Sequence, residues 1–212
     1  MTRSPIVLIF VLCIAACGGS SSSPQGPTAA TVAVQQGDVP PGMMRCDLSG
    51  DIDNFLNKEK SADPATYQST KTEWDDAKSR GATAAYTAFY TDSSSHCAGI
   101  TSNGGDLGSA TYKLVVNFVI QFKDETKAAK GYTSEKVFNF SASQLKASGQ
   151  PVVEGEKTGL SANSITLSQA IGNQTFYIAV WQNKTFMVIL AVLNVDGSAS
   201  KKIASSENSR IK

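Results

Sequence analysis

The chain has 212 residues, of which 41% are hydrophobic and 17% are charged, so it can form a substantial core and is not an intrinsically disordered chain. Arg3 is the only charged residue among the first 16, and the remainder carries 18 Lys and Arg against 18 Asp and Glu. This balance argues against a nucleic-acid-binding surface or a polybasic membrane patch, so no nucleic-acid partner is expected.

The first 16 residues have the pattern of an export signal. Arg3 precedes an apolar run of 11 residues from Ile6 to Ala16, and Gly18, Gly19 and four serines follow. A helix that crosses a membrane needs roughly 20 apolar residues, so this run is too short to be a permanent anchor. Residues 1–16 are therefore predicted to be a cleaved secretory signal.

The end of this signal carries a more specific motif. Ile14-Ala15-Ala16-Cys17 resembles the lipobox of bacterial lipoproteins, in which an aliphatic residue and two small residues precede a cysteine. The resemblance covers residues 1–17 and implies that the Cys17 thiol carries a diacylglycerol with acyl chains such as palmitate. It also implies cleavage before Cys17 and attachment to the extracytoplasmic face of the cell membrane or outer membrane. Two or more acyl chains make such an anchor stable.

Residues 17–31 then read as the lipidated cysteine followed by a Gly/Ser/Pro tether without charge or apolar periodicity. A flexible stretch of this length spans roughly 20 Å, so it would hold a folded body near the bilayer. Residues 32–212 are predicted to form a single globular domain.

Two cysteines remain in that domain, because Cys13 leaves with the signal and Cys17 is used for lipidation. In an oxidising compartment Cys46 and Cys97 are expected to pair, closing a loop of 51 residues. The chain-entropy model gives about 4 kcal/mol of stabilisation for such a loop. A metal site at His96 and Cys97 is disfavoured, because adjacent residues rarely point at one ion and the chain has no second histidine.

Helices are expected at four places in the domain. After an irregular stretch at 36–46, Ser49-Gly50-Asp51 can begin a short helix. Asp63-Pro64 places a capping side chain before a proline at the first position of a second helix, which ends at Gly81. Asp124 caps a third helix, and the last helix starts near Gly197.

Strands are expected at five places. Residues 82–91 mix alanine with alternating aromatic and β-branched residues, and Gly81 before them favours a strand. Residues 111–123 predict a strand with one buried face. One face carries Tyr112, Leu114, Val116, Phe118, Ile120 and Phe122, and the other carries Lys113, Asn117, Gln121 and Lys123. Residues 164–170, 175–181 and 185–193 form a meander with tight turns, and the last is apolar on both faces, as in a central strand.

Residues 93–108 and 139–160 are expected to be irregular, because they are rich in Ser, Gly and Asn or are broken by Gly and Pro. The two halves of the domain show no sequence repeat. The predicted fold is therefore one α+β domain with a mostly antiparallel sheet of about five strands, flanked by helices.

The sequence contains no assembled catalytic motif, so no catalytic residue is assigned. His96 is the only histidine, and its neighbouring serines do not make a triad, so a structural or solvent-facing role is favoured. Asp47, Asp51 and Asp53 supply too few oxygen ligands for calcium and are better explained as charges near a helix start. We expect neither a metal nor a cofactor.

Four aromatic residues could line a recognition surface, although packing in the core is favoured for them: Tyr67, Trp74, Tyr177 and Trp181. Three glycosylation-type sequons, at Asn139, Asn173 and Asn183, are weak evidence for glycosylation, because the export signal resembles a bacterial one.

These features favour a lipid-anchored envelope protein that binds a protein or small-molecule partner without catalysis. Two alternatives stay open at this point. One is a hydrolase-like envelope enzyme whose site is made of scattered carboxylates and serines, and the other is a purely structural envelope lipoprotein.

Overall fold

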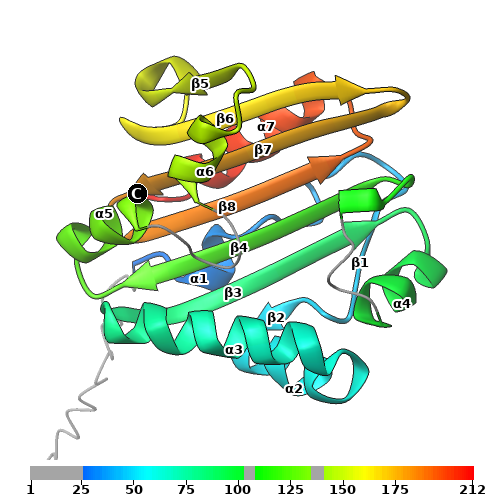
Figure 1. Ribbon diagram of the computed structural model, residues 1–212, viewed down its shortest axis with the longest axis horizontal. Coiled ribbons are helices and arrows are strands. Elements are labelled where there is room, and N and C mark those ends of the chain that lie inside the picture. Colours follow the sequence, from blue (N-terminus) through cyan, green and yellow to red (C-terminus); the bar gives the residue numbers. More distant parts are fainter. Residues whose placement is uncertain (1–25, 103–107, 135–140) are drawn as a thin grey trace, which may run out of the picture.

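The computed structural model describes residues 26–102, 108–134 and 141–212. Its centre is one sheet of eight strands, all paired antiparallel, in the order β1-β3-β4-β8-β7-β6-β5, and β2 also pairs with β3 (Figure 1). The strands are β1 (Met44–Arg45), β2 (Gly50–Asp51), β3 (Ala82–Thr91), β4 (Leu114–Phe122), β5 (Val152–Glu154), β6 (Asn163–Ile171), β7 (Gln174–Asn183) and β8 (Phe186–Leu193).

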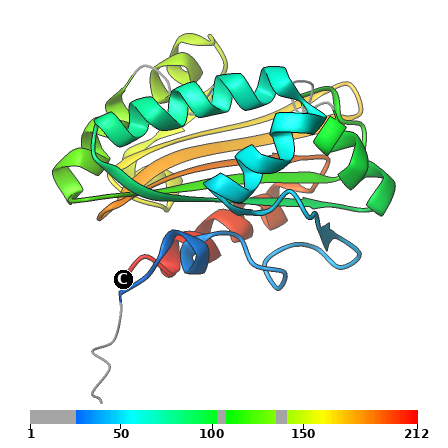
Figure 2. The same ribbon diagram turned by 90° about the horizontal axis from the view of Figure 1, so that it is seen from below.

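Helices cover the two faces of this sheet unequally (Figures 1 and 2). Those from the middle of the chain lie on one face, here called the first face, whereas the first and last helices lie on the opposite, second face. The helices are α1 (Ala29–Val32), α2 (Ile52–Ala62), α3 (Pro64–Ser79), α4 (Ser94–Ser102), α5 (Glu125–Thr133), α6 (Ala142–Ala147), the 3₁₀ helix η2 (Gly155–Thr158) and α7 (Gly197–Ser209).

The α+β class and the antiparallel sheet are confirmed, but the expected number of about five strands is too small. The three additional strands, β1, β2 and β5, have only two or three residues each. Segments of this length show no hydrophobic periodicity, and they become strands only because β3 and β6 offer unpaired edges to them.

The helix boundaries largely follow the local signals. The Asp63 side chain accepts the Thr66 amide at the start of α3, and the Asp124 side chain accepts the Lys127 amide at the start of α5. The chain leaves α3 through Gly81, whose φ of +103° is a conformation that residues with a side chain rarely adopt.

Two stretches expected to be irregular contain regular structure. Within 93–108 the chain forms α4, and within 139–160 it forms α6, β5 and η2. Their helices have few apolar residues and a weak pattern, and α4 buries only Ile100 against the rest of the molecule. The conformation of these segments is therefore determined by contact with the sheet and with neighbouring helices, and not by their own hydrophobic periodicity.

The expectation that β4 has one exposed face is wrong. Every residue of β4 is buried except Gln121, which is half-buried. Leu114 and Ile120 pack in the core of the first face, whereas Val115 and Val119 pack in the core of the second. The second face is covered by chain segments far away in the sequence, and Val115 and Val119 are the residues of β4 whose apolar side chains indicate this cover. The double-sided burial predicted for β8 is confirmed, since all of its residues are buried.

The second face is closed by the two ends of the described chain. The segment at residues 28–39, here called the strap, crosses it beside α7, and the first described residues lie next to the C-terminus (Figure 2). The sequence placed the start of the domain at residue 32, but α1 begins three residues earlier, because Ala29 and Val32 are buried in this layer.

Asn117 links the strap to the centre of the sheet. Its side-chain oxygen accepts the Val34 amide at 3.1 Å, and its amide nitrogen donates to the Ile189 carbonyl at 3.2 Å and to Glu207 at 2.9 Å. A polar residue can occupy this fully buried position because three hydrogen bonds replace those it would make with water. Burial raises the pKa of Glu207 well above its usual range, and the Asn117 hydrogen bond and the charge of Arg210 offset only part of this increase.

Arg210, at the end of α7, clamps the strap directly. Its guanidinium donates to the carbonyls of Val32 and Ala33, each at 3.0 Å, and to the carboxylate of Asp38 at 2.8 Å. The Asp38 side chain is only 12% exposed, so this ion pair is less screened by solvent than a surface pair.

Replacing Arg210 should therefore weaken both the strap and the whole fold. Arg210→Ala is expected to lower the free energy of unfolding by about 2–4 kcal/mol, because it leaves two carbonyls and a partly buried carboxylate without their charged donor. Urea denaturation measures this loss, and hydrogen exchange at the Val34 amide should accelerate. Lys212→Ala, at an exposed neighbouring position, is the control, and equal stability of the two variants would contradict the clamp.

Candidate functional site

Cys46 and Cys97 form the predicted disulfide, with their Cα atoms 5.3 Å apart. The bond joins the segment between β1 and β2 to the first turns of α4. Cys46 is buried and belongs to the first-face core. The disulfide thus fixes α4 to the edge of the sheet, where α4 has little apolar surface of its own.

Next to this disulfide, His96 takes part in two contacts. Its Nδ1 lies 2.6 Å from the Asp92 carboxylate, and its ring stacks on Tyr112 with centroids 3.9 Å apart. The second Asp92 oxygen accepts the Lys113 amide at 3.3 Å. Burial raises the pKa of Asp92, but the hydrogen bonds from His96 and from the Lys113 amide outweigh it, so that pKa lies below its usual value.

This corner resembles half of a catalytic triad, but a nucleophile is not assembled there. Within the described residues, the ring nitrogens of His96 have no hydrogen bond to a serine hydroxyl, and Ser93 Oγ instead accepts the His96 backbone amide. The geometry is that of a side-chain pair that stabilises the first turn of α4. His96 is half-buried, and the role expected for it from the sequence was structural or solvent-facing.

The acidic cluster singled out in the sequence does not converge. Asp47, Asp51 and Asp53 are all exposed and flank the start of α2. Within the described ranges, no group of three or more His, Cys, Asp and Glu side chains is close enough to hold a metal ion.

Glu59 is a buried carboxyl that the sequence did not single out. It lies on the core side of α2, fully buried, and neither of its oxygens has a hydrogen-bond partner within the part of the chain that the structure describes. Burial raises its pKa to about 7, and the charge of Asp63 adds to this increase. A carboxyl with such a pKa is a candidate proton donor or acceptor, but its complete burial denies a substrate access to it.

The aromatic residues are used mainly in packing, as favoured from the sequence. Trp74, Tyr177 and Trp181 are buried, and Tyr67 is half-buried against the first-face core. Of the sequon residues, Asn173 is exposed in the β6–β7 turn and Asn183 donates to Asn208 at 2.9 Å. Cys17 and Asn139 lie outside the described residues.

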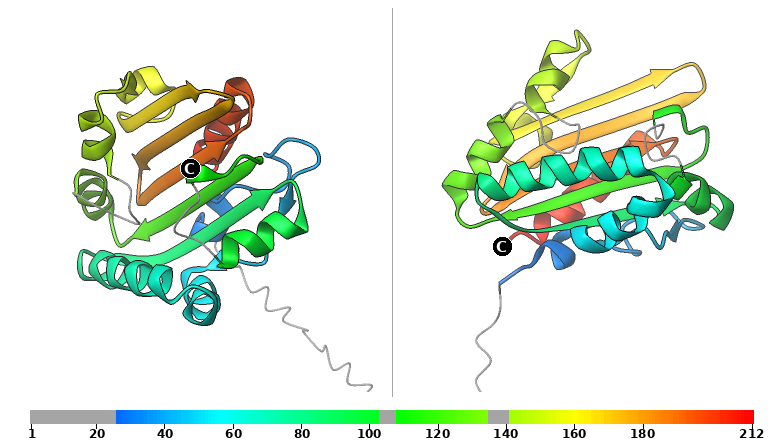
Figure 3. Two further views of the ribbon diagram at one scale, coloured as in Figure 1. Left: turned by 45° about the vertical axis from the view of Figure 1, so that its right-hand side comes forward. Right: turned by 60° about the horizontal axis from the view of Figure 1, so that its bottom comes forward.

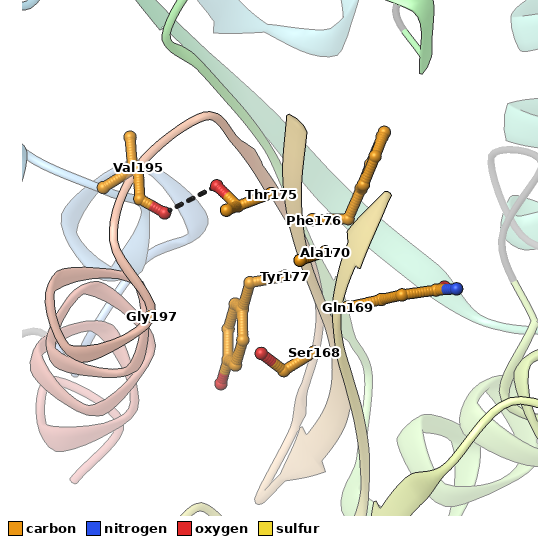
Figure 4. Close-up of a pocket in the computed structure, with 8 residues that line it drawn as sticks. All are labelled: Ser168, Gln169, Ala170, Thr175, Phe176, Tyr177, Val195 and Gly197. Atoms are coloured by element: carbon orange, nitrogen blue, oxygen red, sulfur yellow. Dashed lines mark hydrogen bonds between the residues drawn. The ribbon is translucent and has the colours of Figure 1, made fainter. Parts of the chain in front are cut away.

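A recess of about 160 Å³ lies between the β6–β7 hairpin and the start of α7 (Figure 4). Tyr177 and Ser168 point to the α7 side of the hairpin, and the Thr175 hydroxyl donates to the Val195 carbonyl at 3.1 Å. None of the residues around the recess is charged: Ser168, Gln169, Ala170, Thr175, Phe176, Tyr177, Val195 and Gly197.

This recess could not be predicted from the sequence. Its walls come from two neighbouring strands and from the start of a helix that follows β8, and none of these residues belongs to a chemical motif. Only the strong prediction of the Gly172-Asn173 turn, which is confirmed, pointed to the hairpin itself.

The disulfide should contribute strongly to stability because it closes a long loop. A Cys46→Ser, Cys97→Ser double variant is expected to lose up to about 4 kcal/mol of unfolding free energy. Denaturation with and without reductant measures this loss. Reductant should destabilise the wild-type protein and leave the double variant unchanged, whereas equal stability of the oxidised and reduced wild-type protein would rule out a structural bond.

Ionisation of Glu59 should make stability depend on pH. Its pKa in the folded state, about 7, exceeds the ordinary value of 4.5, so the folded protein holds this proton more tightly than the unfolded chain. The stabilisation is complete below about pH 4.5 and is lost as the pH rises through 7.

Glu59→Gln should therefore match the wild type near pH 4 and exceed it above pH 7, by up to about 3 kcal/mol. Urea denaturation across this pH range tests the prediction. Glu156→Gln, at an exposed position in η2, serves as the control. A constant difference between Glu59→Gln and wild type at all pH values would show that Glu59 does not titrate in this range.

The chain has a distant structural similarity to a known extracellular domain. No family model and no curated protein sequence matches the chain. Among solved structures, the chain is similar to the extracellular domain of PknH from Mycobacterium tuberculosis, with 15% sequence identity and a TM-score of 0.39. The match covers 64% of this chain and 70% of that chain. The function of this protein must therefore be inferred from its own residues.

Proposed function

We propose that this protein is a lipid-anchored, extracytoplasmic module that binds a partner in the cell envelope without catalysing a reaction. The extracytoplasmic location is inferred from the Ile14-Ala15-Ala16-Cys17 motif at the end of an export signal. The Cys46–Cys97 disulfide supports it, because structural disulfides persist in oxidising compartments. None of the helices among the described residues is long and apolar enough to cross a bilayer.

The polar side chains make contacts within the fold, and this favours binding over catalysis. Asp92 and His96 pair with each other, and Asn117 and Arg210 bind the backbone of the strap. These groups hold the fold together, and a substrate would have to displace contacts on which the fold depends. The uncharged recess, by contrast, is open and has room for part of a ligand.

The placement of the hairpin fits a role in binding. The β6–β7 turn lies at the end of the sheet away from the first described residues (Figures 1 and 3). With a lipid at Cys17, this end of the molecule would lie away from the point where the tether joins the domain, where other envelope proteins can reach it.

Replacement of the lipidated residue tests the anchor. Cys17→Ala should move the protein from the membrane fraction to the soluble fraction and abolish its partitioning into the detergent phase of Triton X-114, because the acyl chains are absent. Ser21→Ala, in the tether that follows Cys17, is the matched control and should stay with the membrane. Unchanged membrane recovery of Cys17→Ala would contradict lipidation.

The same cells test partner binding. A membrane-impermeant amine crosslinker applied to intact cells should give a discrete adduct of higher mass with the wild-type protein, and less of it with Cys17→Ala. Recovery of the monomer alone under conditions that crosslink a known envelope complex would contradict a stable partner.

A further inference from the structure

The outer edge of β6 is only partly paired. β5 pairs with Ile165–Leu167, whereas β6 continues for four more residues, Ser168–Ile171, whose outer side has no neighbouring strand among the described residues. This segment is here called the β6 edge. The residue opposite Ser168, if β5 continued, would be Pro151, which has no N–H to donate.

The register shows which backbone groups of the β6 edge are unpaired. Ile171 and Gln174 close a two-residue turn, so they exchange hydrogen bonds with each other, and every second residue of β6 does the same with β7. On β7, the Thr175 carbonyl accepts the Asn194 amide on the opposite side, as this alternation requires. The N–H and C=O groups of Ser168 and Ala170 therefore point outward from the sheet.

The β6 edge lacks the usual protection of exposed strands. Natural edges are commonly blocked by charged side chains, proline or a bulge, because unpaired edges recruit other strands. The β6 edge has none of these, and Ile171 at its end is 55% exposed. Its four residues, Ser-Gln-Ala-Ile, are uncharged.

The recess lies directly beside the β6 edge. The side chains of Ser168 and Ala170 share a face with Tyr177, so residues paired opposite them would direct their side chains to that face as well (Figure 4). A dry cavity of about 150 Å³ accepts benzene, so 160 Å³ is enough for one apolar side chain of that size. A charged side chain would be disfavoured, because none of the residues that line the recess carries a charge to compensate for its desolvation.

We propose that the β6 edge binds an extended segment of a partner protein, which adds as an antiparallel strand and places one uncharged side chain in the recess. The outward N–H and C=O groups of Ser168 and Ala170 supply the main-chain hydrogen bonds, and the recess supplies the selectivity. This inference deepens the proposed function and rests on it for the presence of a partner.

A partner segment is favoured over two other occupants. A lipid surface does not fit, because the hairpin turn lies away from the end where the chain enters the domain (Figure 3), and the lining carries no basic residue. A second copy would join through four residues on each side, whereas stable interfaces use about 20–30 residues on each side. A short linear segment needs no such area.

The test removes one outward N–H and leaves the rest of the fold in place. Ala170→Pro deletes the Ala170 amide, which faces away from β7, so the β6–β7 pairing is retained. Ala170→Ser keeps the amide and is the matched control. Circular dichroism and thermal unfolding establish that both variants are folded, and Ser168→Pro provides a second variant if Ala170→Pro is not.

The probe is a phage-displayed library of random heptapeptides, selected on the folded wild-type protein. The enriched peptides should carry uncharged residues at alternate positions. Synthetic copies should bind wild type and Ala170→Ser equally and bind Ala170→Pro at least tenfold more weakly. Bound peptide should also slow hydrogen exchange at the amides of Ser168 and Ala170.

Three outcomes would overturn the proposal. They are no enrichment, equal binding of the peptides to Ala170→Pro, and a wild-type dimer that Ala170→Pro dissociates, which would assign the edge to a second copy. Envelope crosslinks that persist in Ala170→Pro would leave the proposed function standing and remove only the β6 edge as its site. Loss of membrane attachment in Cys17→Ala does not bear on the edge.

Discussion

The fold depends on covering the second face of its sheet. β4 and β8 carry apolar side chains on both faces, so a single layer of helices would leave half of this surface in water. The cover comes from the strap and α7, the two ends of the described chain. Both bury apolar side chains against the sheet, such as Val32 and Ile203, and hydrogen bonds with Asn117 and Arg210 also hold them in place.

Polar side chains therefore help to hold this hydrophobic layer in place. Asn117 is at the centre because it reaches the strap, β8 and α7 at the same time. Loss of one partner would leave another buried group without its hydrogen bond, which costs more free energy than the bond itself contributes. The strap, β4 and α7 should therefore open together rather than one by one.

The same arrangement bears on the proposed anchor. The chain enters the domain through the strap, so any force transmitted from a lipid at Cys17 would act first on the contacts made by Arg210. The β6–β7 hairpin is at the other end of the sheet, and its outer edge is not part of either core (Figure 3). A strand that joined the β6 edge would extend the sheet without disturbing the layers that stabilise it.

The amino-acid sequence by itself determined the main strands, the caps at Asp63 and Asp124, the Gly172-Asn173 turn and the pairing of Cys46 with Cys97. These features follow from local backbone chemistry, from a two-residue period, or from Cys46 and Cys97 being the two cysteines of the predicted domain. Only the tertiary structure decided that Asn117 and Glu59 are buried and that β1, β2 and β5 are strands. Each of these depends on segments distant in the sequence, since burial and edge pairing are properties of neighbours in space that no local pattern records.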